Sequence, residues 1–149
     1  MKVAIGSDHA GYALKESVRA YLAERGYEVE DCGVDSEQPA DYPDYAAKVA
    51  VRVAAHYVGS GILICGTGLG VAIAANKVPG IRAATCNNTL LARFAREHND
   101  SNVLAMGGRI VAPGEARRIV DTWFETEFAG GRHQQRVDKI TAIEERNRE

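Results

Sequence analysis

One stretch near the middle of the chain, ILICGTGLGVA at residues 62–72, decides the fold. Its first part is a continuous apolar run, which is typical of a strand buried on both faces of a sheet. Glycines at positions 66, 68 and 70 then lead into a second apolar run that we expect to begin a helix. A buried strand that turns through glycines into a helix favours a parallel sheet covered by helices.

The same alternation extends over the whole chain. Short apolar and β-branched runs predict strands at residues 2–7, 27–32, 61–65, 81–86 and 102–106. Helices are predicted from the i, i+4 repeats Leu14-Val18-Leu22 and Val49-Val53-Tyr57, and over residues 70–76, 89–98, 113–124 and about 134–146. We therefore expect a single α/β domain over residues 1–149: a doubly wound, Rossmann-like, five-stranded parallel sheet sandwiched between helices.

Composition excludes several classes of function. The chain of 149 residues has a formal net charge of −2, so it lacks the broad basic field that attracts nucleic acid or an anionic membrane. Its apolar runs are far shorter than the ~20 residues that span a bilayer, and a strand-like run directly after Met1 leaves no room for a signal peptide. Three cysteines without a CxxC pair argue against a disulfide framework and a structural zinc site. We expect a soluble protein of the reducing cytoplasm.

Ligands of doubly wound sheets bind beyond the carboxyl ends of the strands. The polar segments that follow strands there are Asp8-His9, residues 66–70, Asn87-Asn88 and residues 107–109. We expect the loop His98-Asn99-Asp100 at the same functional edge, with the long polar loop 35–44 beside it.

The glycine loop predicts an anion site. Glycines allow backbone amides to approach a ligand closely, so residues 66–70 could hold a phosphate, a carboxylate or an enediolate. The spacing is not a dinucleotide fingerprint, because GxGxxG requires glycine where Val71 stands, and no Walker lysine follows. A purely structural turn is the alternative.

Cys65 is the last residue of the predicted strand before this loop. No aspartate or glutamate occurs between Tyr45 and Arg96, so Cys65 is the one local group able to act as a base, and Thr67 could only relay a proton. The alternative is that Cys65 is a small buried apolar residue.

Histidines and arginines supply the other candidates. His9 and His98 could move a proton on a substrate oxygen near neutral pH, or be surface residues. The spacing of Asp8, His9, His98 and Asp100 does not resemble a metal-ligand motif, so we expect no metal. Arg132 and Arg136 are four residues apart on the last helix and could grip a phosphate together, or form a solvated face. Arg109 follows two glycines at a strand end.

Together these segments resemble the ribose-5-phosphate isomerase B family, which also includes allose-6-phosphate and galactose-6-phosphate isomerases. The resemblance covers nearly the whole chain and rests on GSDHAG (6–11), DYP (41–43), CGTGLG (65–70) with AANK (74–77), HNDSNVL (98–104) and GGRHQQR (130–136). Several separate motifs in register are more specific than one glycine loop.

The resemblance implies a metal-independent aldose–ketose isomerase without a cofactor. It implies that Cys65 is the base at C2, that His98 donates a proton in ring opening, and that Thr67 relays a proton between O1 and O2. The sugar phosphate would be bound by Asp8, His9, Gly66, Thr67, Gly68, Leu69, Gly70, Asn99, Arg109, Arg132 and Arg136. Relatives with serine at the cysteine position carry a glutamate nearby, whereas this chain has Cys65 and no acid there.

The resemblance further implies a homodimer, or a higher oligomer, whose active sites draw residues from two subunits. The expected substrates are ribose 5-phosphate and ribulose 5-phosphate, interconverted through an enediolate. A six-carbon sugar phosphate such as allose 6-phosphate is the nearer alternative, and a non-catalytic nucleotide- or sugar-phosphate-binding module is the more distant one.

Overall fold

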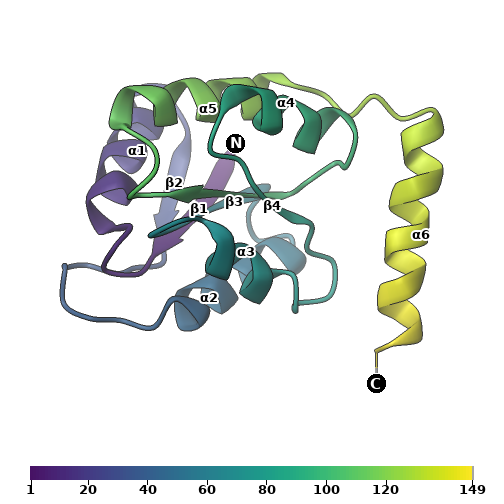
Figure 1. Ribbon diagram of the computed structural model, residues 1–149, viewed down its shortest axis with the longest axis horizontal. Helices are drawn as coiled ribbons and strands as arrows, with labels where there is room; N and C mark the ends of the chain where they lie inside the picture. The colour runs from purple at the N-terminus through teal and green to yellow at the C-terminus, as the bar shows by residue number, and fades with distance from the viewer. Residues whose placement is uncertain (149) are drawn as a thin grey trace.

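The computed structural model describes residues 1–148 and contains a five-stranded parallel sheet in the order β2-β1-β3-β5-β4 (Figure 1). The strands are β1 (Lys2–Ser7), β2 (Glu28–Asp31), β3 (Ser60–Cys65), β4 (Ala83–Thr85) and β5 (Val103–Gly107). β3 is buried along its whole length, as its continuous apolar run predicts, and pairs with β1 on one side and β5 on the other.

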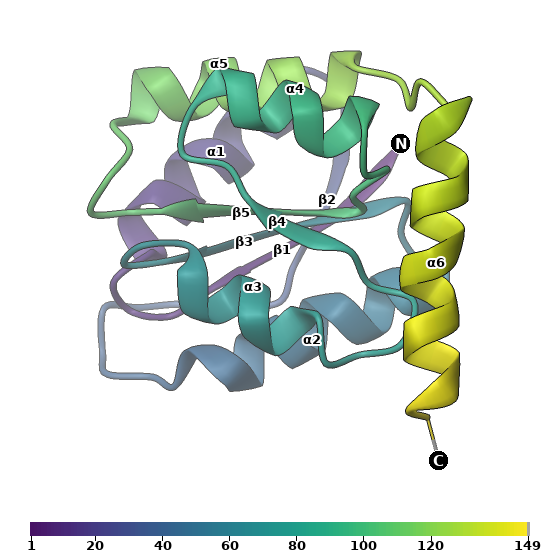
Figure 2. The same cartoon turned by 45° about the vertical axis from the view of Figure 1, so that its right-hand side comes forward.

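Helices cover both faces of the sheet, which confirms the predicted doubly wound α/β fold (Figures 1 and 2). They are α1 (Tyr12–Glu24), α2 (Tyr42–Ala54), α3 (Leu69–Ala75), α4 (Thr89–Glu97), α5 (Pro113–Glu125) and α6 (Arg132–Arg146). One core cluster joins α1, α4 and α5 to the sheet, and the other joins α2 and α3 to its opposite face. Along residues 1–148 no helix is long and apolar enough to cross a membrane.

Helix ends differ slightly from the prediction. α6 begins at Arg132, two residues before the predicted start, so both arginines of its first turns lie on the helix. The predicted repeat Val49-Val53-Tyr57 was wrong at its last member, because α2 ends at Ala54 and Tyr57 is exposed. His56 has a positive φ of 61°, a conformation that stops a right-handed helix.

Strand order places the ligand-binding edge. The chain passes from β1 outward to β2 and then returns to β3 on the other side of β1, so the topological switch lies between β1 and β3. Ligands of doubly wound sheets bind in the crevice at this point, beyond the carboxyl ends of the strands. Asp8 follows β1 and Gly66 follows β3 there.

The loop His98-Asn99-Asp100 lies elsewhere, and its predicted place at the carboxyl edge was wrong. α4 starts after β4 at the carboxyl edge and runs back across the sheet, so His98 at its end precedes β5 at the amino edge. Figure 2 shows α6 standing beside this same edge, away from the arrowheads of the strands.

Candidate active site

The end of β3 holds Cys65 against the glycine loop. Its side chain is buried, and its Sγ accepts a hydrogen bond of 3.2 Å from the backbone N–H of Gly68. Gly68 adopts a left-handed φ of 84°, which glycine reaches without steric cost and which turns its amide back toward the sulfur. A thiolate accepts such a bond more strongly than a thiol does. The loop therefore directs a backbone donor at the Cys65 sulfur.

The glycine loop is packed tightly on the end of β5. A Cβ built on Gly68 would lie 2.8 Å from the carbonyl carbon of Met106, and one on Gly107 would lie 2.7 Å from that of Thr67. Both distances are shorter than real Cβ contacts, so each position requires glycine. The amides of the loop are thus fixed in place by backbone packing.

Two polar side chains brace the loop from the end of β4. Thr85 Oγ1 donates to Gly68 O at 2.7 Å. Asn87 donates through Nδ2 to Thr67 O at 2.9 Å and accepts from Gly107 N–H through Oδ1 at 2.8 Å. Asn87 was among the predicted edge residues without a role, and Thr85 was not singled out, because its only sequence signal is its position at a strand end.

Thr67 is exposed on the loop. Its Oγ1 accepts the N–H of Leu69 at 3.2 Å, so its hydroxyl proton is free to point outward. The side chain of Leu69 is also exposed. At Gly70, a built Cβ would lie 2.5 Å from Cε1 of Tyr42, so the Tyr42 ring covers the loop at this point. Tyr42 belongs to a quoted motif but was not predicted as a site residue.

Asp8 and His9 lie beside the end of β3. The backbone N–H of Asp8 donates to Ile64 O at 3.3 Å, and its buried carboxylate accepts from Gly11 N–H at 3.0 Å. His9 Nδ1 lies 3.0 Å from Ala40 N and 3.2 Å from Ala40 O, so this nitrogen finds a backbone partner in either tautomer of the ring. The loop containing Ala40 thus borders the site, as predicted.

Arg109 provides positive charge at the same place. Its backbone N–H donates to Gly66 O at 3.0 Å, and its side chain passes over Gly66, where a built Cβ would lie 3.2 Å from Nη1. The guanidinium is exposed and can reach an anion bound by the loop. Cys65, the glycine loop, Asp8, His9 and Arg109 therefore form one cluster at the carboxyl edge, which we call the thiol cluster.

The remaining predicted residues form a second cluster at the amino edge. The ring of His98 is stacked between Phe94, with centroids 4.7 Å apart, and His133, at 4.3 Å. Exposed Arg132 and Arg136 lie one turn apart on α6 beside His133. Asn99 follows His98 and is also exposed. We call His98, Asn99, Arg132 and Arg136 the arginine cluster.

From its sequence, His133 is a weaker candidate for a site residue than His9 or His98, because it stands beside arginines. Burial and the charges of His98, Arg132 and Arg136 lower the pKa of His133 below its usual value.

The two clusters are separate within one chain. Asn102, at the start of β5, bonds the backbone of Gly61, and Cys65 lies four strand residues further, or about 13 Å. His98 and Asn99 precede Asn102 and lie beyond that edge. One chain thus places a thiol beside the backbone amides of the glycine loop at one edge of the sheet, and a histidine beside two guanidinium groups at the other edge.

The other cysteines differ from Cys65. Burial raises the pKa of the Cys86 thiol to about 12 and also raises that of Cys32. Neither is followed by a glycine loop. Among residues 1–148, no group of three or more His, Cys, Asp or Glu side chains is arranged to hold a metal ion.

Comparison with known proteins identifies the family to which this chain belongs. The family model described as Ribose/Galactose Isomerase matches residues 3–140. The chain is 54% identical over 145 residues to ribose-5-phosphate isomerase B of Escherichia coli K12, covering 97% of each. It superimposes on the Clostridium thermocellum ribose-5-phosphate isomerase B structure with a TM-score of 0.98, 55% identity and 99% and 100% coverage of the two chains. For the Mycoplasma genitalium enzyme with bound ribulose-5-phosphate, the TM-score is 0.93 at 42% identity, with coverage of 97% and 96%. A match over almost the whole length, in sequence and in structure, shows that the chain belongs to the Ribose/Galactose Isomerase family.

Proposed function

We propose that this protein interconverts ribose 5-phosphate and ribulose 5-phosphate, with Cys65 as the base. The observation that carries the proposal is the contact between Cys65 Sγ and Gly68 N–H inside a loop of fixed amides. Its support from relatives is that two named above are ribose-5-phosphate isomerases B and that a third holds ribulose-5-phosphate.

The chemistry follows from the two clusters. The furanose opens when His98, assisted by Asp8, donates a proton to the ring oxygen while the C1 hydroxyl loses its own proton, so that the bond between C1 and the ring oxygen breaks and C1 becomes an aldehyde. The Cys65 thiolate then removes the C2 proton, and the electron pair shifts toward O1 to give an enediolate. Backbone amides of residues 66–70 stabilise the oxyanion, an effect for which loss of one donor costs about 3 kcal/mol. Thr67 moves a proton between O1 and O2, and Cys65 returns its proton to C1.

The two arginines of the arginine cluster bind the phosphate in this proposal. Arg132 and Arg136 lie on one face of α6, where two guanidinium groups can grip a dianion. Holding the phosphate fixes C2 near the sulfur, which converts proton transfer into an intramolecular step. His9, Asn99 and Arg109 complete the contacts to the sugar in this proposal.

We further propose a homodimer in which the thiol cluster of one subunit meets the arginine cluster of the other. The separation of the clusters within one chain supports this arrangement. α6 lies beside the amino edge of the sheet and covers neither of its faces (Figures 1 and 2), with Val137 buried and Ile140 and Ile143 about half exposed. On α3, Leu69 and Ile73 are exposed as well. Such unpartnered apolar faces on a chain with an incomplete site favour a second copy as the occupant.

Subunit complementation tests the shared site. Cys65→Ala and His98→Ala chains, each inactive, are produced separately and together in one cell. A shared site gives a mixed dimer one intact site out of two, so the co-produced sample should reach about a quarter of wild-type activity. Absence of activity in a verified mixed dimer would contradict the shared site.

Turnover of the purified protein tests the function itself. Ribose 5-phosphate, allose 6-phosphate and galactose 6-phosphate are compared with and without a chelator, because the family description names galactose as well as ribose. We expect ribose 5-phosphate to be preferred and the chelator to have no effect. Binding of the sugar phosphates without turnover would point to a non-catalytic module, and activity restored by a divalent ion would contradict metal independence. We place the protein in the cytoplasm, in keeping with its three free cysteines.

A further inference from the structure

The loop that carries His98 and Asn99 has an uncommon backbone conformation. Asp100 adopts a positive φ of 48°, in the left-handed region that costs a non-glycine residue about 1 kcal/mol. Surrounding contacts must stabilise such a residue for it to persist. Side chains outside the loop must therefore hold residues 98–101 in place.

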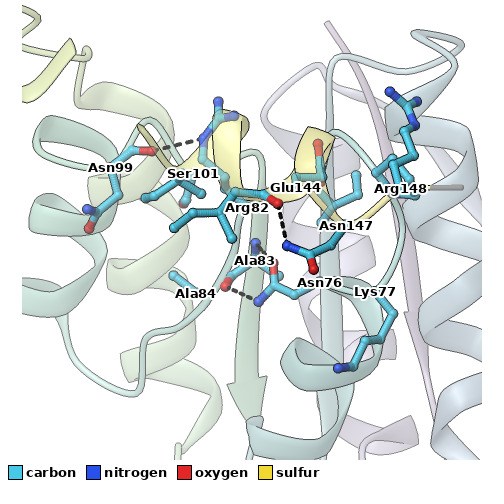
Figure 3. A pocket seen from close by; sticks show the side chains of 14 residues that line it. Asn76, Lys77, Arg82, Ala83, Ala84, Asn99, Ser101, Glu144, Asn147 and Arg148 are labelled. Carbon is cyan, nitrogen blue, oxygen red and sulfur yellow. Dashed lines mark hydrogen bonds between the residues drawn. The ribbon is translucent and has the colours of Figure 1, made fainter. Parts of the chain in front are cut away.

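Arg82, in the turn before β4, holds the loop from one side. Its Nε donates to Asn99 O at 3.0 Å and to Asp100 O at 3.1 Å, and its Nη2 donates to Asp100 O at 2.9 Å. Figure 3 shows the Arg82 side chain directed at Asn99. The backbone of Arg82 also bonds Asn102 in both directions, through the Asn102 side chain and its N–H. One residue thus fixes the chain at three points, Asn99, Asp100 and Asn102.

Arg96, on α4, holds the loop from the other side. Its Nη1 donates to Asp100 Oδ1 at 3.0 Å and to Ser101 O, while Asp100 Oδ2 faces Arg82 at 3.5 Å. The Arg96 guanidinium lies over the ring of Trp123, whose Nε1 donates to the buried hydroxyl of Ser101 at 3.1 Å. The Asp100 carboxylate is therefore shared between two guanidinium groups, which are themselves held by the core.

These contacts leave the functional groups of the loop free. Every bond from Arg82 and Arg96 goes to a carbonyl or to Asp100, and none goes to the side chains of His98 or Asn99. Asn99 and Arg82 line the same groove of about 790 Å³ beneath α6. The loop is thus fixed through its backbone, while the side chain of Asn99 is exposed and that of His98 is half-buried in its ring stack.

We propose that Arg82, acting through Asp100 with Arg96, is a positioning residue that sets the location of His98 and Asn99 for catalysis. This inference rests on the proposed function, because it assigns the loop to the substrate. Arg82 contacts neither substrate nor reacting atoms in this account. Displacement of a catalytic group by about 1 Å can lower a rate about 100-fold, so loss of the Arg82 contacts should lower the rate of isomerisation measurably.

The test compares Arg82→Met with a matched control, Arg52→Met. Arg52 on α2 forms a similar two-pronged pair with Glu30 on β2, at 2.8 and 2.6 Å. β2 is the edge strand at the end of the sheet opposite to β4, which Arg82 precedes. We expect Arg82→Met to lower kcat/KM for ribose 5-phosphate about 100-fold and Arg52→Met to leave it unchanged. Arg82→Lys, which keeps one donor, and Asp100→Asn, which tolerates the left-handed backbone, should lie between these values.

A second readout separates positioning from general damage. Exchange of the C1 hydrogen of open-chain ribulose 5-phosphate with deuterated water requires the Cys65 step but no ring opening. Arg82→Met should lower this exchange clearly less than it lowers isomerisation of ribose 5-phosphate, since the thiol cluster is intact and the exchange uses the sugar contact of Asn99 but not the ring-opening proton of His98. Equal loss of both reactions, or the same kcat/KM as Arg52→Met, would overturn the proposal.

Nuclear magnetic resonance of the histidine rings tests the position of His98 without relying on enzyme activity. The Cε1–H signal of His98 is shifted by its stacking against Phe94 and His133. It should move in Arg82→Met and stay in Arg52→Met. An unmoved signal would refute positioning by Arg82, whereas an inactive wild type with a moved signal would refute only the proposed function.

Discussion

Replacing Gly68 by alanine perturbs the anion-binding loop at its most constrained point. Its φ of 84° costs an alanine about 1 kcal/mol, and the added Cβ would lie 2.8 Å from the Met106 carbonyl carbon. Relief of that clash requires backbone movement, which costs a further 1 to 3 kcal/mol or so. Movement of the loop also withdraws the Gly68 N–H from Cys65 and displaces the neighbouring amides that stabilise the oxyanion, and loss of one such donor lowers kcat about 100-fold.

Gly26→Ala is the matched control. Gly26 has nearly the same φ, 86°, but a Cβ built there has nothing within 4 Å. The two variants thus share the backbone penalty and differ in the clash. Thermal unfolding followed by circular dichroism should show a Tm for Gly68→Ala lower than that of Gly26→Ala by about 5 °C. In the isomerase assay, Gly26→Ala should match wild type. Equal kcat/KM for the two variants would refute the claim that loop geometry sets the rate.

Three further predictions concern stability and reactivity. The hydrogen bond from Arg19, followed by that from Lys15, lowers the pKa of Glu16 from 4.5 to about 2 against the opposing effect of burial. The carboxylate therefore contributes stability above about pH 4.5 that is lost as the pH falls toward 2, and urea unfolding of Glu16→Gln should show a flatter pH dependence in that range. Lys15→Met should lower the free energy of unfolding by about 2 kcal/mol, because Asp31 loses a buried donor at 2.8 and 2.9 Å; an unchanged urea midpoint would contradict this. Cys86, with its pKa raised to about 12, should resist iodoacetamide in the native protein and react in urea, as mass spectrometry of peptides would show; rapid native labelling would disprove it.

Local signals in the sequence predicted much of the fold and the position of the thiol cluster at the carboxyl edge of the sheet. The continuous apolar run before Cys65 and the glycines after it specify a buried strand and a tight loop, because both depend on residues adjacent in the chain. Asp8 was placed correctly for the same reason, since it directly follows a strand.

Features that depend on how distant parts of the chain are arranged could not be predicted from the sequence. The loop after α4 is polar, as a carboxyl-edge loop is, but the direction of the helix places His98 at the amino edge. Tyr57 fits the apolar repeat of α2, yet the left-handed His56 ends that helix region first. The role of Arg82 depends on contacts with residues 17 and 18 positions away, which no spacing rule reveals.

In the proposed reaction the Cys65 thiolate moves the proton between C2 and C1. Cys65→Ala, with Cys86→Ala as the control, is assayed for isomerisation of ribose 5-phosphate and for binding of ribulose 5-phosphate by calorimetry. Loss of the base should lower turnover at least about 100-fold while binding is retained, and the Cys86 variant should stay active. Undiminished turnover in Cys65→Ala would contradict the account.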